Sequence, residues 1–142
     1  MLISTKGRYA LRVMIELAGY QKDEYVPLIT IAKKQAISEK YLESILAVLS
    51  KSGIIDGLRG KGGGYRLNRE AKDYSVGEIL RLTEGSLAPV ACLDIKPNKC
   101  EHASSCRTLP LWEKLDSIIC DYLDSVSLAD LVDSSLDGNY CV

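Results

Sequence analysis

The sequence predicts a mainly α-helical fold with one small β-hairpin, in which a winged helix-turn-helix is followed by a long C-terminal helix. Two observations predict this fold class. Residues 27–68 hold two helix-like segments joined by a tight turn and then a glycine-rich hairpin, the element order of a winged helix. Residues 110–126 repeat apolar side chains at intervals of four and three, the spacing of a coiled-coil seam.

The first predicted helix covers residues 4–20, and Ser4 or Thr5 can cap its N-terminus. Its apolar face is formed by Ala10, Val13, Met14, Leu17 and Ala18. Three cations lie near its start, and they either grip phosphate or form a solvated face: Lys6, Arg8 and Arg12.

The second and third helices flank a predicted turn at residues 35–37. Ser38 is placed to cap the third helix, because its hydroxyl can accept an unpaired amide of the first turn. This helix covers residues 39–51 and ends before Gly53. The apolar positions of the two helices are Leu28, Ile31 and Ala32, then Leu42, Ile45, Leu46 and Leu49. The opposite face of the third helix is short or charged: Glu39, Lys40, Glu43, Ala47 and Lys51.

Two short strands are predicted next, at residues 54–59 and 65–68, and the tip between them holds Lys61 among glycines. A nucleotide-binding loop would lead into a helix and end in Lys-Ser or Lys-Thr, and neither is present. A slim helix beside a flexible basic loop fits the grooves of DNA, although a hairpin without a ligand has the same pattern.

Past the hairpin, residues 75–78 match a capping box, in which Ser75 and Glu78 satisfy each other's amides. The helix that follows ends at Gly85, and residues 87–109 show no clear period, which predicts an irregular loop. The long helix begins at Pro110. Its seam is formed by Leu111, Leu115, Ile118 and Tyr122, with a second stripe of Trp112, Ile119, Leu123 and Val126.

This apolar surface is wider than the helix needs in order to pack one of its sides against a small domain. It favours a subunit interface over packing within the chain, and a two-fold dimer would present two copies of the third helix to a palindromic DNA site. A last short helix is expected to begin at residue 127 and to end at Gly138.

Charge is distributed unevenly along a chain whose net charge is only −1. Residues 1–72 hold 13 Lys and Arg against 7 Asp and Glu, whereas residues 73–142 hold 5 against 12. The basic half suggests a polyanionic partner, and the acidic half is badly suited to touch nucleic acid. At 142 residues the chain can bury one modest core.

Neither a membrane protein nor an enzyme is predicted. No run of 18 apolar residues occurs, and the N-terminus lacks the pattern of a signal peptide, so a cytoplasmic, reducing location is expected. With one histidine, no Ser-His-Asp set and no carboxylate pair, the sequence offers no catalytic constellation.

In a reducing location, cysteines indicate metal or redox chemistry before disulfides. Cys92, Cys100 and Cys106 form a C-x7-C-x5-C pattern within the irregular loop. Such thiolates suit a soft metal or an iron–sulfur cluster, but three ligands are one short of a closed site. His102 lies between two of them, and unrelated thiols or a structural zinc remain alternatives. Cys120 is expected to be a small core residue, and Cys141 is assigned no role.

Several of these stretches together resemble the IscR-like winged-helix transcription regulators, whose members include NsrR and CymR. The resemblance rests on the stretches at residues 4–10 (STKGRYA), 37–43 (ISEKYLE), 59–65 (RGKGGGY) and 75–78 (SVGE), the three-cysteine loop, and Leu111-Trp112. It extends over nearly the whole chain.

The resemblance implies a homodimeric bacterial regulator that binds double-stranded DNA at a palindromic operator. Residues 1–84 would be the DNA-binding domain, 85–109 a cluster-binding loop and 110–142 the dimerisation helix with a short final helix. The helix at 39–51 would read the major groove and the hairpin at 59–64 the minor groove. The candidate DNA-binding residues are Ser38, Lys40, Tyr41, Glu43, Ser44, Arg59, Lys61 and Gly62.

Individual side chains have roles that their chemistry supports. Lys40 can contact phosphate or guanine, while Arg59 and Lys61 can enter a narrow minor groove. Glu43 lowers affinity for DNA unless it accepts from a cytosine amino group, so it can act as a selectivity filter.

The three cysteines would hold an iron–sulfur cluster, most often [2Fe-2S], that alters which DNA is bound and so controls genes of cluster biogenesis. The fourth ligand is unassigned, because the family's histidine position is occupied by Leu109 and the carboxylate position of nitric-oxide-sensing relatives by Arg8. The first cysteine gap is also longer than usual. Two alternatives remain: the same fold sensing nitric oxide or thiol redox state, and a small iron–sulfur redox protein.

Overall fold

A computed structural model describes residues 3–133. Its helices are α1 (Thr5–Ala18), α2 (Leu28–Gln35), α3 (Glu39–Lys51), α4 (Val76–Glu84), α5 (Leu109–Ser125) and α6 (Leu128–Val132). Strands β1 (Ile55–Leu58) and β2 (Gly64–Leu67) form one antiparallel hairpin, and single 3-10 turns lie at Ala71–Asp73 and Ala91–Leu93. The predicted mainly α-helical fold with one hairpin is confirmed.

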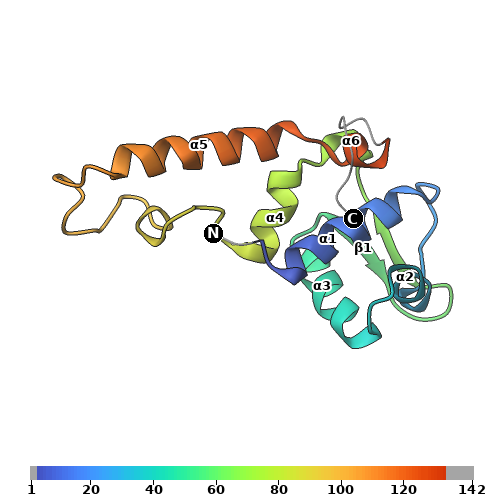
Figure 1. Cartoon of the computed structure of the whole chain (residues 1–142). Coiled ribbons are helices and arrows are strands. Elements are labelled where there is room, and N and C mark those ends of the chain that lie inside the picture. Colours follow the sequence, from blue (N-terminus) through green and yellow to red (C-terminus); the bar gives the residue numbers. More distant parts are fainter. Residues whose placement is uncertain (1–2, 134–142) are drawn as a thin grey trace.

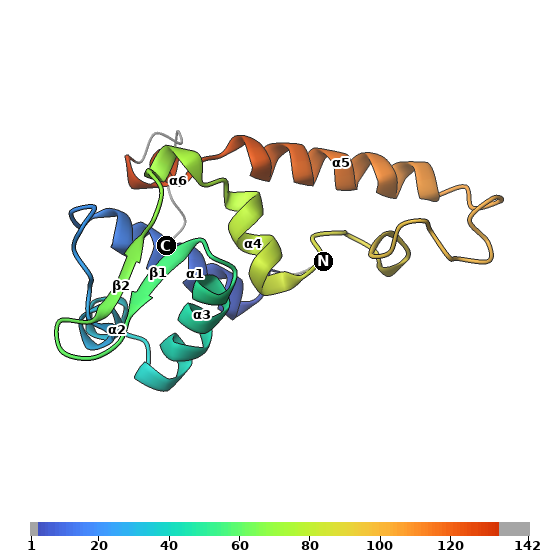
Figure 2. The same ribbon diagram turned by 180° about the vertical axis from the view of Figure 1, so that it is seen from behind.

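The molecule has a compact body and a projecting arm (Figure 1). Helices α1 to α4 and the hairpin form the body, whereas α5 extends away from it with the segment at residues 85–108 running back beneath the helix. Viewed from behind, the hairpin lies beside α2 and α3 at the end of the body opposite the arm (Figure 2). No helix of the described residues is long and apolar enough to span a membrane.

One apolar core unites the body. Its fully buried side chains come from all three helices α1 to α3, from the hairpin and from the segments after it, and they include Val13, Met14, Ile31, Leu42, Ile45, Leu46, Leu49, Ile55, Tyr74, Ile79 and Leu128. The apolar faces predicted for α1 to α3 all lie in this core or against it. Burial of such aliphatic side chains contributes about 1.5–3 kcal/mol each.

Serine caps define most helix starts. Ser4 Oγ accepts from the amide of Gly7 at 3.1 Å, so Ser4 rather than Thr5 is the cap of α1. Ser38 Oγ accepts from the amide of Tyr41 at 3.2 Å, as predicted for α3. Helix α1 ends at Ala18, two residues earlier than expected.

The capping box predicted at residues 75–78 is only half formed. Ser75 Oγ accepts from the amide of Glu78 at 3.0 Å, but the Glu78 carboxylate accepts from the Arg69 guanidinium at 2.9 and 3.0 Å. A bidentate ion pair is a stronger partner for a carboxylate than one backbone amide. A complete box forms instead at the start of α6, between Ser127 and Asp130. That helix ends at Val132; the predicted end at Gly138, and Cys141, lie outside the described residues.

The turn between α2 and α3 is tight because Ala36 adopts left-handed backbone angles (φ 53°). The amide of Ile37 then donates to the carbonyl of Ala32 at 3.0 Å, which closes α2 and turns the chain into α3. Gly53, with φ 79°, follows α3 as predicted.

The hairpin is fastened to the body through its second strand. Val26 and Tyr65 exchange two backbone hydrogen bonds of 2.8 and 2.9 Å. Gly64 permits this approach, since a Cβ there would collide with the carbonyl of Val26. At the hairpin base, the buried Tyr74 hydroxyl donates to the Ile54 carbonyl at 2.7 Å and accepts from the amides of Asn68 and Arg69 at 3.1 Å.

The arm is attached to the body mainly through α4. Arg81 forms a bidentate ion pair with Asp124 of α5, with distances of 2.7 and 2.9 Å. A small apolar cluster lies beside it: Val76, Leu80, Leu87 and Val126, with Leu123 partly buried against them. No residue of α5 itself is buried.

Candidate nucleic-acid interface and cysteine segment

Helix α3 turns one face into the core and leaves the other open to solvent. Leu42, Ile45, Leu46 and Leu49 are buried, as the spacing predicted. Four candidate DNA-binding residues of this region are exposed: Ser38, Lys40, Glu43 and Ser44. The fifth, Tyr41, is half-buried. The Ser44 hydroxyl donates to the carbonyl of Tyr41 at 2.6 Å, whereas Ser38 caps the helix.

The half-buried Tyr41 is held by α1. Its ring packs edge-on against Tyr9 with centroids 5.9 Å apart. The guanidinium of Arg12 lies over the ring of Tyr9, 4.9 Å from its centroid. The same guanidinium donates to the side-chain oxygen of Gln35 at 3.0 Å and to its backbone carbonyl at 2.8 Å. These contacts join α1, the end of α2 and the start of α3, so they fix how α3 protrudes.

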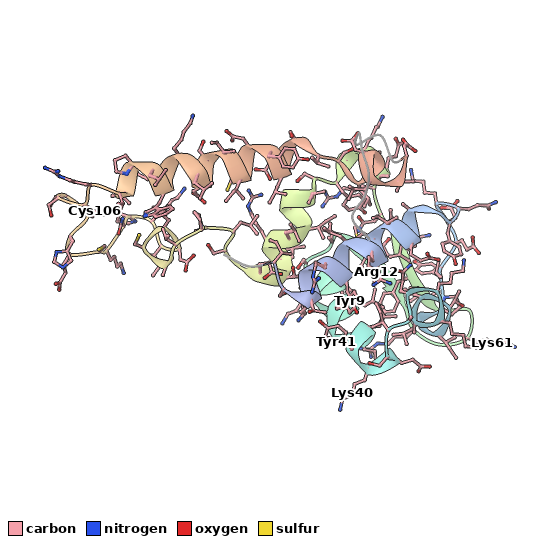
Figure 3. All side chains as sticks on the ribbon, viewed as in Figure 1. Tyr9, Arg12, Lys40, Tyr41, Lys61 and Cys106 are labelled. Atoms are coloured by element: carbon pink, nitrogen blue, oxygen red, sulfur yellow. The ribbon has the colours of Figure 1, made fainter. Side chains whose placement is uncertain are left out.

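The hairpin tip presents the second group of candidate residues. Arg59, Lys61 and Gly62 are exposed, and Gly60 and Gly62 have positive φ angles of 91° and 77° that let the tip fold back on itself. Lys40 and Lys61 both project outward from the body (Figure 3). Within residues 3–133, no ion pair or side-chain hydrogen bond involves Lys40, Arg59 or Lys61. These cations are therefore available to a polyanion.

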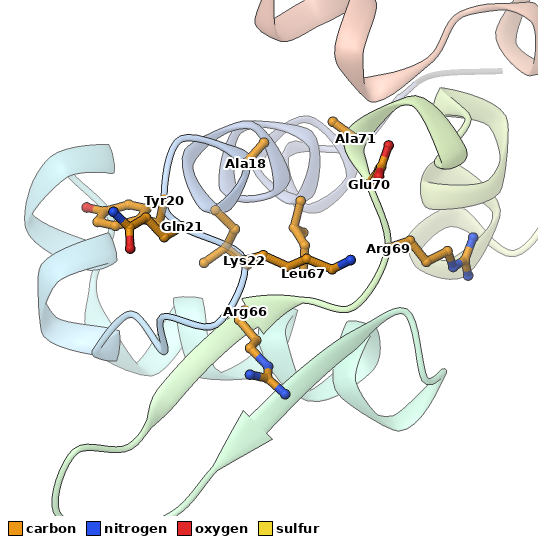
Figure 4. A pocket seen from close by; sticks show the side chains of 10 residues that line it. Ala18, Tyr20, Gln21, Lys22, Arg66, Leu67, Arg69, Glu70 and Ala71 are labelled. Carbon is orange, nitrogen blue, oxygen red and sulfur yellow. The ribbon is translucent and has the colours of Figure 1, made fainter.

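Two other cations of the body, Arg66 and Arg69, are already paired. A pocket of about 200 Å³ lies between the end of α1 and β2 (Figure 4). Arg66 and Arg69 line it, but Arg66 pairs with Asp56 at 3.5 Å and stacks on Tyr25, and Arg69 pairs with Glu78. The pocket therefore offers an anion no free guanidinium.

The three candidate cluster ligands lie in the segment between α4 and α5. Cys106 sits just before α5, at the end opposite Lys61 (Figure 3). Cys92 and Cys106 are partly exposed and Cys100 is exposed, and all three are free thiols. Residues 87–108 are irregular as predicted, apart from the 3-10 turn that contains Cys92, whereas Leu109 already belongs to α5.

The thiol of Cys106 has hydrogen-bonding groups close to its sulfur. The side chain of Thr108 lies 3.4 Å from its Sγ, and the amides of Thr108 and Leu109 point toward it. Hydrogen-bond donors stabilise a thiolate, so these contacts lower the pKa of Cys106 below its ordinary value.

The donors suit an iron–sulfur cluster in their chemistry, because free thiols are the ligands that such clusters take. Among residues 3–133, however, no three His, Cys, Asp or Glu side chains are gathered closely enough to hold a metal ion. Leu109 carries no donor atom, Arg8 donates to Thr5, and His102 is exposed in the same loop. The fourth ligand stays unassigned.

Cys120 differs from expectation, since it is partly exposed and not a core residue. It lies on the side of α5 that faces residues 86–98, beside Asp116. The contacts by which Tyr9, Arg12 and Gln35 position α3 were not predicted. The paired aromatic residues of α1 and α3 were the available signal.

Comparison with known proteins gives a consistent result. The family model Rrf2, described as an iron-dependent transcriptional regulator, matches residues 3–134. The HTH-type transcriptional regulator IscR of Vibrio campbellii is 34% identical over 93% of this chain and 77% of its own length. Among solved structures, CymR, the global cysteine regulator of B. subtilis, has a TM-score of 0.76 and 36% identity over 96% of this chain and 99% of that one. T. potens IscR has a TM-score of 0.71 and 35% identity over 100% and 93%.

Proposed function

The chain belongs to the Rrf2 family of transcriptional regulators, and on that premise we propose that it binds a palindromic DNA operator as a cytoplasmic homodimer whose affinity is set by its cysteine segment. The relatives are regulators and not enzymes, in agreement with the lack of a catalytic constellation. The observation that carries the proposal is the set of unpaired cations on the exposed side of α3 and on the hairpin tip.

DNA recognition is divided between these two elements. Helix α3 enters the major groove, where Lys40 contacts phosphate or guanine and Glu43 favours a cytosine amino group. Ser38, Tyr41 and Ser44 complete the surface of the helix. The hairpin tip places Arg59, Lys61 and Gly62 at the adjacent minor groove, where narrow stretches attract cations.

The dimer is formed by the seam of α5. Leu111, Ile118 and Tyr122 are 59%, 53% and 58% exposed in the single chain, and Leu115 is 37% exposed. A continuous stripe of large apolar side chains at this exposure is typical of an interface that a second copy covers. Two-fold pairing makes the operator palindromic.

Cys92, Cys100 and Cys106 would hold the cluster, proposed as [2Fe-2S], with a fourth ligand from elsewhere. A bound cluster would supply a signal-dependent charge and would order the segment between α4 and α5. Genes of cluster biogenesis are the proposed targets, as the resemblance to the IscR-like regulators implies.

A second input is favoured by one observation. Cys106 is accessible and its pKa is lowered, which are the properties of a thiol that reacts with oxidants. Under this alternative the same fold responds to thiol oxidation and not to a cluster. CymR, a global cysteine regulator, is a structural neighbour in which the same overall fold occurs.

DNA binding is tested with a duplex that the protein itself selects from a random pool. We expect binding to weaken steeply as the salt concentration rises. The Lys61→Ala variant should reduce the slope of log Kd against log salt by about one, because one phosphate contact is lost. Lys114→Ala is the matched control, since this exposed lysine lies on the arm. Selection of no duplex, or equal slopes for both variants, would contradict the proposal.

The two inputs are separated by protein prepared without oxygen. Visible absorption with bound iron that disappears in Cys92→Ala supports the cluster. The thiol input is supported if the protein is colourless and free of iron, its DNA affinity changes on mild oxidation, and the Cys106→Ser variant no longer shows this change. Colourless protein that is indifferent to oxidation would remove both.

A further inference from the structure

A shallow groove lies between the start of α2, the exposed side of α3 and the base of the hairpin. It encloses about 430 Å³ and is lined mostly by apolar side chains and glycines: Pro27, Leu28, Ile29, Glu43, Leu58, Arg59, Gly60, Gly63, Gly64 and Tyr65. Two large aliphatic side chains in it are unusually open to solvent for this body. Ile29 is 49% exposed and Leu58 is 48% exposed, whereas Ile31 and Ile55 of the same elements are buried.

The position of the groove identifies its occupant. If α3 lies in the major groove and the hairpin tip in the neighbouring minor groove, the DNA strand that separates the two grooves must cross the surface between these elements. That surface is the groove just described, because Glu43 of α3 forms one side and Arg59 of the hairpin another. This step rests on the proposed function.

The side chains that line the groove indicate which part of the DNA strand it contacts. Its one carboxylate, Glu43, repels phosphate, and its one cation, Arg59, stands toward the hairpin tip. Ile29 and Leu58 offer only hydrocarbon, which matches the deoxyribose ring and not the phosphate. We propose that Ile29 and Leu58 form a paired apolar contact with the deoxyribose units of the strand crossing this groove, so that they set the seating of α3 independently of base sequence.

Such a contact has a clear energetic signature. Covering two half-exposed aliphatic side chains with sugar removes apolar surface from water without pairing any charge. The loss of either side chain therefore lowers affinity while the number of phosphate contacts, and with it the salt slope, stays the same. Because both side chains are already exposed in the free protein, their truncation leaves the core intact.

The first test measures Kd and its salt dependence on the selected duplex for Ile29→Ala, Leu58→Ala and the double variant. We expect a loss of about fivefold for each single variant, at an unchanged salt slope. Val132→Ala, an exposed aliphatic residue of α6, is the matched control and keeps the affinity of the unmodified protein. Unchanged affinity in both single variants, with Lys61→Ala still altering the slope, overturns this inference and leaves the proposed function standing.

The second test locates the contact on the DNA. Hydroxyl radicals attack deoxyribose, so we expect two or three protected sugars between the major-groove and minor-groove footprints, and loss of this protection in the double variant. Replacing thymine by uracil throughout the duplex removes the methyl groups that an aliphatic side chain would otherwise contact. An Ile29→Ala effect that disappears on the uracil duplex would assign the side chain to a base and overturn the sugar contact. Absence of any footprint from the unmodified protein would instead count against the proposed function.

Discussion

The body and the arm of this molecule differ in how far they bury their apolar side chains. In the body, α1 and α3 have every predicted apolar position buried or packed against one core. In the arm, α5 is the longest helix of the described residues, and none of its residues is buried. All three helices have a regular apolar stripe in the sequence, but the seam of α5 finds no cover within the chain.

This difference separates two meanings of the same sequence pattern. An apolar stripe predicts that a helix packs against something, but it does not specify what. For α3 the partner is its own chain, which leaves its polar side exposed for the proposed contact with DNA. For the seam of α5 the single chain provides no cover, which supports the proposed dimer interface.

The seam is expected to be the most sensitive site for DNA binding. Ile118→Glu places a carboxylate in the middle of the exposed stripe, where a second copy would have to bury it unpaired. We expect a monomer by analytical ultracentrifugation and at least about a hundredfold weaker binding to the palindromic duplex, because the two half-sites are no longer linked. Ser117→Glu introduces the same charge on another side of α5 and should stay dimeric. A dimeric Ile118→Glu would show that the seam has another role.

The hairpin attachment is expected to be the most sensitive backbone site of the body. In Gly64→Ala, the new Cβ collides with the carbonyl of Val26, so the strand pairing that fastens the hairpin must open. We expect a loss of about 3 kcal/mol in the free energy of unfolding, measured with urea.

The matched control is Gly62→Ala, which has a positive φ but nothing within 4 Å of the added methyl group. Only the backbone preference is lost there, at a cost of about 1 kcal/mol. Equal losses at both glycines would mean that the contact with Val26 does not hold the hairpin.

The hydroxyl of Tyr74 is expected to make the next largest contribution to the free energy of unfolding. Tyr74→Phe leaves the Ile54 carbonyl and the amides of Asn68 and Arg69 without this partner. Unpaired buried polar groups are costly, so we expect a loss of about 2 kcal/mol with an unchanged dimer. Burial also raises the pKa of Tyr74, so its phenol stays protonated through the neutral range and continues to donate. A loss below about 0.5 kcal/mol would indicate that water replaces the hydroxyl.

The ion pair between body and arm is expected to contribute least. Arg81 lowers the pKa of Asp124, so this carboxylate stabilises the fold above its unfolded pKa, and the stabilisation is lost as pH falls through the lower folded pKa. Both side chains are more than one third exposed, which limits the contribution to below about 1 kcal/mol. We expect Asp124→Asn to be slightly less stable than the unmodified protein at neutral pH and equal to it in acid. A difference that persists in acid would contradict this assignment.

Local chemistry explains how much of the fold could be predicted. The start of α3 at Glu39 and its end before Gly53 were correct, because a serine cap and a glycine stop act within one helical turn. The half-formed capping box was predicted wrongly as complete, because the better partner of Glu78 is Arg69. All candidate DNA-binding residues except the half-buried Tyr41 are exposed, as a winged helix requires, but their contacts with DNA remain a proposal.

The sequence by itself determined the order and periods of the helices, the basic hairpin and the grouping of three cysteines in one segment, since each depends on residues a few positions apart. Only the tertiary structure decided how they are used. The packing of Tyr9 on Tyr41, the approach of Gly64 to Val26 and the exposure of the α5 seam depend on elements far apart in the chain. Such contacts form only when the whole core closes, and no local pattern encodes which surfaces that closure leaves uncovered.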